Sequence, residues 1–223
     1  MPFTNILNKL NLSQDVINLA NGKVKFPKFT FETPAQPIFA FIPKLIPILG
    51  NNNWPGFIGV YYDWFNPTEI KYISYYCESN TYYEIAFNYK QLIVFLAFNF
   101  YLNLPEIEEA GEFCKNVGLC ERNEIEEYFK GLNCIEDLKK HSVFKNKIPL
   151  SIIEPDKGFE LTNEFNLNFI ENEIMNGNYL NAWNIITTSN IEPAIVKKYM
   201  IFFEKKCDNP LFEEYIKVWS KYQ

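Results

Sequence analysis

The sequence predicts an α+β fold, in which a twisted antiparallel sheet flanked by helices is followed by an all-helical C-terminal extension. Two observations lead to this prediction. Up to about residue 105 the chain is aromatic, interrupted by prolines and rich in β-forming residues, whereas beyond it helix-capping residues recur at short intervals. The chain has 223 residues, 48% of them hydrophobic, which is enough for a large core. We therefore expect an α+β domain over residues 1–104 and a helical region over residues 105–223.

The first elements are expected to be one or two short helices and an edge strand. Ser13 is a suitable N-cap, and Asn21 with Gly22 forms a typical helix stop. In residues 24–31 the apolar alternation changes face at Pro27, and proline cannot donate to a β-ladder. This pattern predicts an edge strand with a bulge.

Four further segments are predicted to form the rest of the sheet. Turn compositions rich in Asn, Pro and Gly separate residues 38–48, 57–64 and 70–76, and a short strand follows at residues 82–86. Both faces of residues 57–64 are apolar, which is typical of a central strand.

The period then becomes helical. Asn88 with Gln91 resembles a capping box, and residues 89–102 are apolar on nearly every face, so we expect a helix buried against the sheet. Caps and stops predict further helices near residues 105–117, 123–130, 134–141, 163–176, 179–188, 192–206 and 210–221. Residues 143–155 alternate instead, and predict an extended linker or an added strand.

Composition argues against several classes of function. The net charge is −6, the pI is about 5.0 and Arg122 is the only arginine, so a nucleic-acid binder is disfavoured. No apolar run approaches the roughly 20 residues of a membrane span, and no export signal is visible. The five cysteines form no C-x-x-C pair, and no glycine-rich phosphate loop is present. We expect a cytoplasmic protein with no cofactor, no metal site, and neither a nucleic-acid nor a membrane partner.

No residue is predicted to be catalytic. The one histidine, His141, follows two lysines near a predicted helix C-terminus, where a solvated cation is the simpler interpretation. A hydrolase would need a cleft containing acids such as Asp63, Glu69 or Glu84.

Glutamates concentrate in residues 106–127, which contain eight of them against Lys115 and Arg122, a local net charge of −6. A solvated helical face is the simplest interpretation, and a surface that docks a basic partner is the functional one. Paired carboxylates for glycoside hydrolysis are a weaker alternative. The candidate partner-binding residues here are Glu106, Glu108, Glu109, Glu112, Glu124 and Glu127.

Aromatic residues are dense between residues 54 and 83. Core packing explains most of them, but tyrosines and tryptophans left exposed would form a binding surface, to which we assign Trp54 and Trp64 as candidates. A sheet that stacks RNA bases is a third interpretation, opposed by the acidic charge.

Residues 36–104 resemble the SUKH superfamily. The matching positions are Pro47-Ile48, a strand ending in Asp63, Ile85-Ala86 before the cap of a helix, and Phe95-Leu96 within that helix. The resemblance implies a sheet flanked by helices and a non-enzymatic binding protein, since many members look like immunity proteins that neutralise bacterial toxins. A rigid surface would then occlude the active site of the toxin. The partner expected on this interpretation is a basic toxin domain. An intracellular adaptor or scaffold is the alternative, and an unrecognised hydrolase is less favoured.

Overall fold

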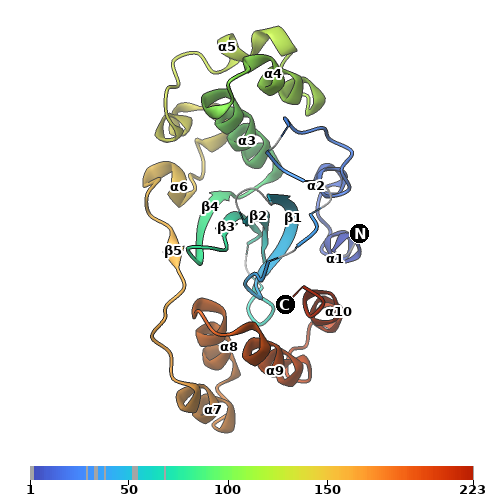
Figure 1. Ribbon diagram of the computed structural model, residues 1–223, viewed down its shortest axis with the longest axis vertical. Helices are drawn as coiled ribbons and strands as arrows, with labels where there is room; N and C mark the ends of the chain where they lie inside the picture. The colour runs from blue at the N-terminus through green and yellow to red at the C-terminus, as the bar shows by residue number, and fades with distance from the viewer. Residues whose placement is uncertain are drawn as a thin grey trace.

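The computed structural model describes residues 3–28, 30–32, 35–37, 39–51, 55–67 and 69–222, and confirms the α+β fold (Figure 1). Within these residues an open antiparallel sheet has the strand order β1-β2-β3-β4-β5. Its strands are β1 (Leu45–Asn51), β2 (Gly56–Tyr61), β3 (Lys71–Tyr76), β4 (Thr81–Ala86) and β5 (Phe159–Glu160). The sheet lies at the middle of the molecule, with α3 to α6 at one side of it and α7 to α10 at the other.

The predicted strands at residues 57–64, 70–76 and 82–86 are confirmed as β2, β3 and β4, with β2 in an inner position. The strand predicted at residues 38–48 begins only at Leu45, and residue 38 lies outside the described residues. The β1–β2 register shifts between Pro47 and Leu49, as expected where a proline removes a ladder donor.

The edge strand predicted over residues 24–31 is wrong for its described residues, which are irregular. Phe26 and Phe31 contact each other at 5.8 Å between ring centroids, and both pack on Phe100. A backbone that directs both rings to one cluster cannot also alternate along a strand. The nearest β-pairing in the described residues is at Glu32, just after this segment, which forms an isolated antiparallel bridge with Gly50.

The helices follow the predicted caps and stops closely. Two short helices precede the sheet, Ser13 is an N-cap, and Gly22 has a positive φ of 67° after the second helix. The α-helices are α1 (Thr4–Lys9), α2 (Gln14–Ala20), α3 (Tyr89–Asn103), α4 (Ile107–Asn116), α5 (Ile125–Tyr128), α6 (Leu150–Ile153), α7 (Leu167–Met175), α8 (Tyr179–Thr188), α9 (Pro193–Glu204) and α10 (Pro210–Trp219). The 3-10 helices are η1 (Arg122–Glu124), η2 (Ile135–Lys140) and η3 (Ser142–Phe144).

The extended linker or added strand predicted at residues 143–155 is wrong. This segment contains the end of η3 and the whole of α6, and strand pairing begins only at Phe159 of β5. Gln91 accounts for the compact path, because its amide group donates to the carbonyl oxygens of Val143 (3.1 Å) and Lys147 (2.8 Å) and holds the segment against α3.

The C-terminal helices pack directly on the sheet and share its core. The Tyr215 hydroxyl donates to the carbonyl oxygen of Leu45 at 2.7 Å, and the Trp219 indole donates to that of Phe41 at 3.0 Å. Both side chains are buried in the same hydrophobic cluster as Ile46. The change of pattern near residue 105 thus lies within one continuous core.

Candidate functional site

The glutamate-rich segment forms an exposed face on α4, η1 and α5, at one end of the molecule (Figure 1). Helix α4 buries Ala110, Phe113 and Cys114 and turns its acidic side chains outward. Glu106 is its N-cap, and helix acids in the first turn interact favourably with the helix dipole. We call the exposed set the acidic face, and it consists of the six predicted residues Glu106, Glu108, Glu109, Glu112, Glu124 and Glu127.

Only part of the acidic charge is balanced locally. Glu127 pairs with Lys130 at 3.1 Å, and Glu109 accepts from the backbone N–H of Lys28 at 3.1 Å. Glu124 closes a capping box around η1 by accepting from the N–H of Glu121. Among the eight glutamates of residues 106–127, all of which the structure describes, the side chains of Glu106, Glu108, Glu112 and Glu126 have neither an ion pair nor a hydrogen bond.

The acidic face is held rigidly by aromatic packing beneath it. Phe113 of α4 contacts Phe100 of α3 at 5.0 Å, edge to face, and Phe129 contacts Phe98 at 5.0 Å. A preorganised charged surface loses little conformational freedom when it binds.

Gly111 determines how closely η1 approaches α4. A Cβ atom at this position would lie 2.2 Å from the carbonyl oxygen of Arg122, which is shorter than any van der Waals contact. Only glycine therefore permits the approach that brings the two halves of the acidic face together. Sequence reasoning missed this residue, although a glycine inside a helical pattern signals close packing.

The two predicted aromatic site residues have different outcomes. Trp64 is 1% exposed, donates its indole N–H to the carbonyl oxygen of Pro43 and stacks against Tyr215 at 4.7 Å. The expectation that Trp64 contacts a partner is corrected on this ground, because its ring and its N–H are both used inside the core. Trp54 lies outside the described residues.

The acids that a hydrolase would need are each paired with a lysine. Asp63 forms an ion pair with the buried Lys44 at 2.7 Å, Glu84 with Lys71 at 2.5 Å, and Glu69 with Lys147. Each carboxylate thus has its own cation, and the cations of the Glu84 and Glu69 pairs, Lys71 and Lys147, both lie over the ring of Phe87.

The histidine and most of the cysteines are buried or partly buried. His141 is half-buried beside Tyr128, and burial lowers the pKa of its imidazole, so it is less solvated than the sequence predicts. The cysteines are free thiols, and burial raises the pKa of Cys77 to about 12. No group of three or more His, Cys, Asp or Glu side chains in the described parts of the chain could hold a metal ion.

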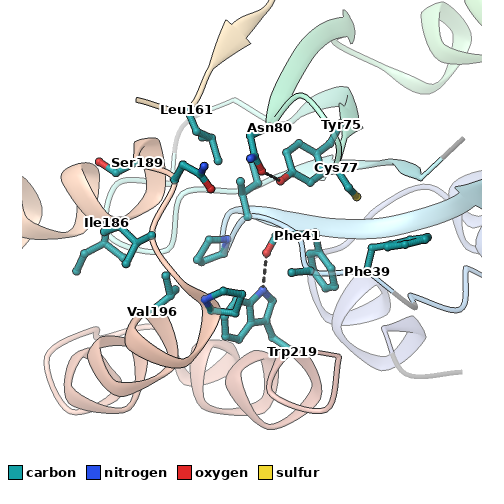
Figure 2. Close-up of a pocket in the computed structure, with 16 residues that line it drawn as sticks. Phe39, Phe41, Tyr75, Cys77, Asn80, Leu161, Ile186, Ser189, Val196 and Trp219 are labelled. Atoms are coloured by element: carbon teal, nitrogen blue, oxygen red, sulfur yellow. Dashed lines mark hydrogen bonds between the residues drawn. The ribbon is translucent and has the colours of Figure 1, made fainter. Parts of the chain in front are cut away.

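A cavity of about 300 Å³ lies between the sheet and the C-terminal helices, and we call it the C-terminal cavity (Figure 2). The Tyr75 hydroxyl donates to Asn80 Oδ1 at 3.0 Å in its wall, beside Cys77. Its lining residues are uncharged, and the Ser189 hydroxyl among them is buried without a hydrogen bond. The described lining of the C-terminal cavity contains no His, Asp, Glu or Lys that could act as a base for the Cys77 thiol. It would offer a ligand mainly apolar contacts.

None of the described helices is both long and apolar enough to cross a membrane. Comparison of the chain with family models, curated proteins and solved structures finds no match. The SUKH resemblance therefore stays a prediction.

Proposed function

We propose that the chain is a protein-binding module that docks a basic partner through its acidic face, and that it acts as an immunity protein by covering the active site of a bacterial toxin. One observation carries the proposal. The net charge of residues 106–127 equals that of the whole chain, so the other 201 residues contain as many basic as acidic side chains. The charge is thus concentrated on one rigid face.

Such a concentration favours association with a cationic surface. Complementary charges increase the association rate and select against wrong partners more than they increase affinity. Four carboxylates of this segment have no partner within the described part of the protein and are free to pair with lysine or arginine of a partner. Carboxylates at the rim of an interface cost little desolvation when they do so.

The resemblance to the SUKH superfamily gives the proposal its specific form. A toxin that cleaves nucleic acid is basic where it holds its substrate, because phosphate binding depends on Lys and Arg. A carboxylate face could compete for that groove without any catalytic group of its own. The pairing of Asp63, Glu69 and Glu84 with lysines is compatible with this non-enzymatic mechanism.

An adaptor is the second candidate, favoured by exposed apolar side chains at the other end of the molecule. Helix α7 buries only Ile170 among its described residues and contacts mainly α8. Large exposed hydrophobic side chains mark interaction surfaces when they gather in one region. Those on or beside α7, α8 and α9 are Phe165, Phe169, Met175, Leu180, Ile201 and Phe202.

The first experiment uses the tagged chain to capture proteins from its source organism, with washes at low and then high salt. The proposal expects one stoichiometric basic partner, released by salt, that is toxic when expressed alone. Several substoichiometric proteins that resist the salt wash would favour the adaptor.

A matched pair of triple variants then tests the acidic face. Glu106→Gln, Glu108→Gln and Glu112→Gln together remove three unpaired charges of the acidic face, whereas Asp156→Asn, Glu164→Gln and Glu171→Gln remove the same charge elsewhere. We expect the first variant to bind the captured partner about tenfold more slowly at low salt, with weaker salt dependence, and the second to bind as the parent does. Equal association rates for both variants would show that the acidic face is not the docking surface.

A further inference from the structure

A second cavity, larger than the C-terminal cavity, lies on the opposite face of the sheet from it. Its volume is about 780 Å³, and we call it the α3 cavity because one wall is the C-terminal half of α3. The other wall is the face of β2, β3 and β4 that carries Ile58, Ser74 and Tyr83, which are paired side by side in the sheet. Sites for small molecules commonly have volumes of about 300–1,000 Å³.

The walls of the α3 cavity are mostly apolar and firmly built. Ile58, Ile85, Leu96 and Phe100 are each less than 5% exposed and belong to the central core. Side chains in such a core keep one conformation, so the cavity does not need to be opened by a ligand.

Polar side chains also line the cavity, and one of them has no partner. Ser151 of α6 lines the cavity, is 5% exposed, and its hydroxyl makes no hydrogen bond. The hydroxyl oxygen has almost no accessible surface, so a ligand reaches it only when the side chain rotates toward the cavity, and it then supplies the hydrogen bond that the buried group lacks. Sequence reasoning missed Ser151, because nothing in its neighbourhood in the chain shows that it faces a cavity.

The lining also defines the charge of a ligand. Glu78 is the only charged side chain among the lining residues, and no lysine, arginine or histidine is present there. An anionic ligand would lose its hydration without meeting a cation, which is costly. The cavity therefore suits a neutral molecule better than an anionic one.

We propose that the α3 cavity binds a neutral, largely aromatic small molecule whose hydrogen-bonding group contacts the Ser151 hydroxyl. Tyr76 and Tyr83, whose rings meet edge to face at 5.7 Å, would supply an aromatic wall for it. This site is separate from the acidic face and does not depend on a protein partner.

The test is a titration of the full chain with two fluorescent probes, the neutral dye Nile red and the anionic dye 1-anilinonaphthalene-8-sulfonate. We expect saturable binding of about one Nile red per chain, and at least tenfold weaker binding of the anionic dye. Failure of Nile red to bind saturably, or equal affinity for the two dyes, would overturn the proposal.

Variants assign the binding to the cavity. Ser74→Phe places a ring inside the cavity and should abolish Nile red binding, whereas Ser142→Phe places the same ring on the surface and should leave it unchanged. Ser151→Ala should weaken binding of a neutral ligand that can hydrogen-bond, such as 2-naphthol, about three- to tenfold without lowering the melting temperature.

The Ser151→Ala variant keeps the proposal testable if Ser74→Phe does not fold, because removing an unpartnered hydroxyl leaves no group unsatisfied. Nile red that still binds folded Ser74→Phe at parental affinity would place the dye elsewhere, for example at the exposed apolar side chains of α7 to α9, and would overturn the proposal. Unchanged 2-naphthol affinity in Ser151→Ala would overturn the role of Ser151.

Discussion

The two faces of the sheet are covered by helices in two different ways. The face toward α3 is covered by the helix that directly follows β4 in the chain, which is apolar all round and buries residues such as Leu92 and Val94 completely. The other face is covered by α8, α9 and α10, the first of which begins at Tyr179, long after α3 ends at Asn103. On that face polar tips of aromatic side chains, such as Tyr215 and Trp219, bond to backbone groups.

The difference shows that a nearby helix needs only apolar surface, whereas distant helices are positioned by specific polar contacts. Asp63 at the end of the β2 segment pairs with Lys44 and also accepts from the indole of Trp183 in α8, at 3.2 Å. Lys44 in turn donates to Asn184 of α8 at 3.1 Å. Hydrogen bonds of this kind define one orientation, because apolar packing alone is non-directional.

The largest expected effect comes from breaking the ion pair on the C-terminal face. In Lys44→Met the Asp63 carboxylate keeps a mostly buried charge without its cation, which costs about 3–5 kcal/mol of unfolding free energy. Urea unfolding followed by tryptophan fluorescence measures it. Lys130→Met is the control, because its pair with Glu127 is exposed and should change stability by less than about 1 kcal/mol. Equal losses in both variants would contradict the specific role of Lys44.

On the α3 face the corresponding polar contact is made by Gln91, and its loss should cost less. Its side-chain oxygen accepts from the N–H of Phe87 while its amide group holds the segment at residues 143–147. Gln91→Leu should lower the unfolding free energy by about 2–3 kcal/mol, since buried backbone groups lose their partners. Hydrogen exchange should show faster opening of η3 and α6 than of β2. Unchanged protection of η3 would show that other contacts hold the segment.

Tyr215→Phe removes a single hydroxyl from the C-terminal face and keeps the ring. We expect a loss of about 1–2 kcal/mol, because the buried carbonyl oxygen of Leu45 loses a donor. Tyr222→Phe, at a partly buried position near the C-terminus, is the control and should change the unfolding free energy by less than about 0.5 kcal/mol. Thermal unfolding distinguishes the two. A neutral Tyr215→Phe would mean that shape alone positions α10.

The smallest expected change in stability comes from removing the two hydroxyls without a hydrogen bond, one beside each face of the sheet. Ser151→Ala and Ser189→Ala should each leave stability unchanged or raise it by up to about 1 kcal/mol, because a buried group without a hydrogen bond is removed. Urea midpoints measure both. A clear loss of stability in either variant would show that its hydroxyl is bonded, for example to a buried water.

Local elements were predictable because their signals come from neighbouring residues. The cap at Asn88, whose side chain accepts from the N–H of Gln91 at 3.0 Å, and the span of α8 at residues 179–188 follow from periods and caps alone. The exposed glutamates of α4 were predictable for the same reason, since acids opposite an apolar stripe face solvent.

Other features depended on residues far away in the chain. The path of residues 24–31 is decided by an aromatic cluster with Phe100, and the burial of Trp64 by contact with Tyr215. A period-two pattern describes only which side chains are apolar and not which neighbours will cover them. For this reason residues 24–31 were assigned to a strand and Trp64 to an exposed surface. Gly111 and Ser151 acquire their roles only through the backbone and cavity beside them.

The sequence by itself determined the α+β class, the succession of capped helices and the concentration of charge in residues 106–127, because each depends on composition or on side chains within a few positions. The tertiary structure decided the pairing of Lys44 with Asp63 beside α8, the joining of α4 and η1 at Gly111, and the two cavities with their unpartnered serines. These require separate elements of the chain to meet, and many arrangements of the same apolar pattern would satisfy local preferences until packing and buried hydrogen bonds select one.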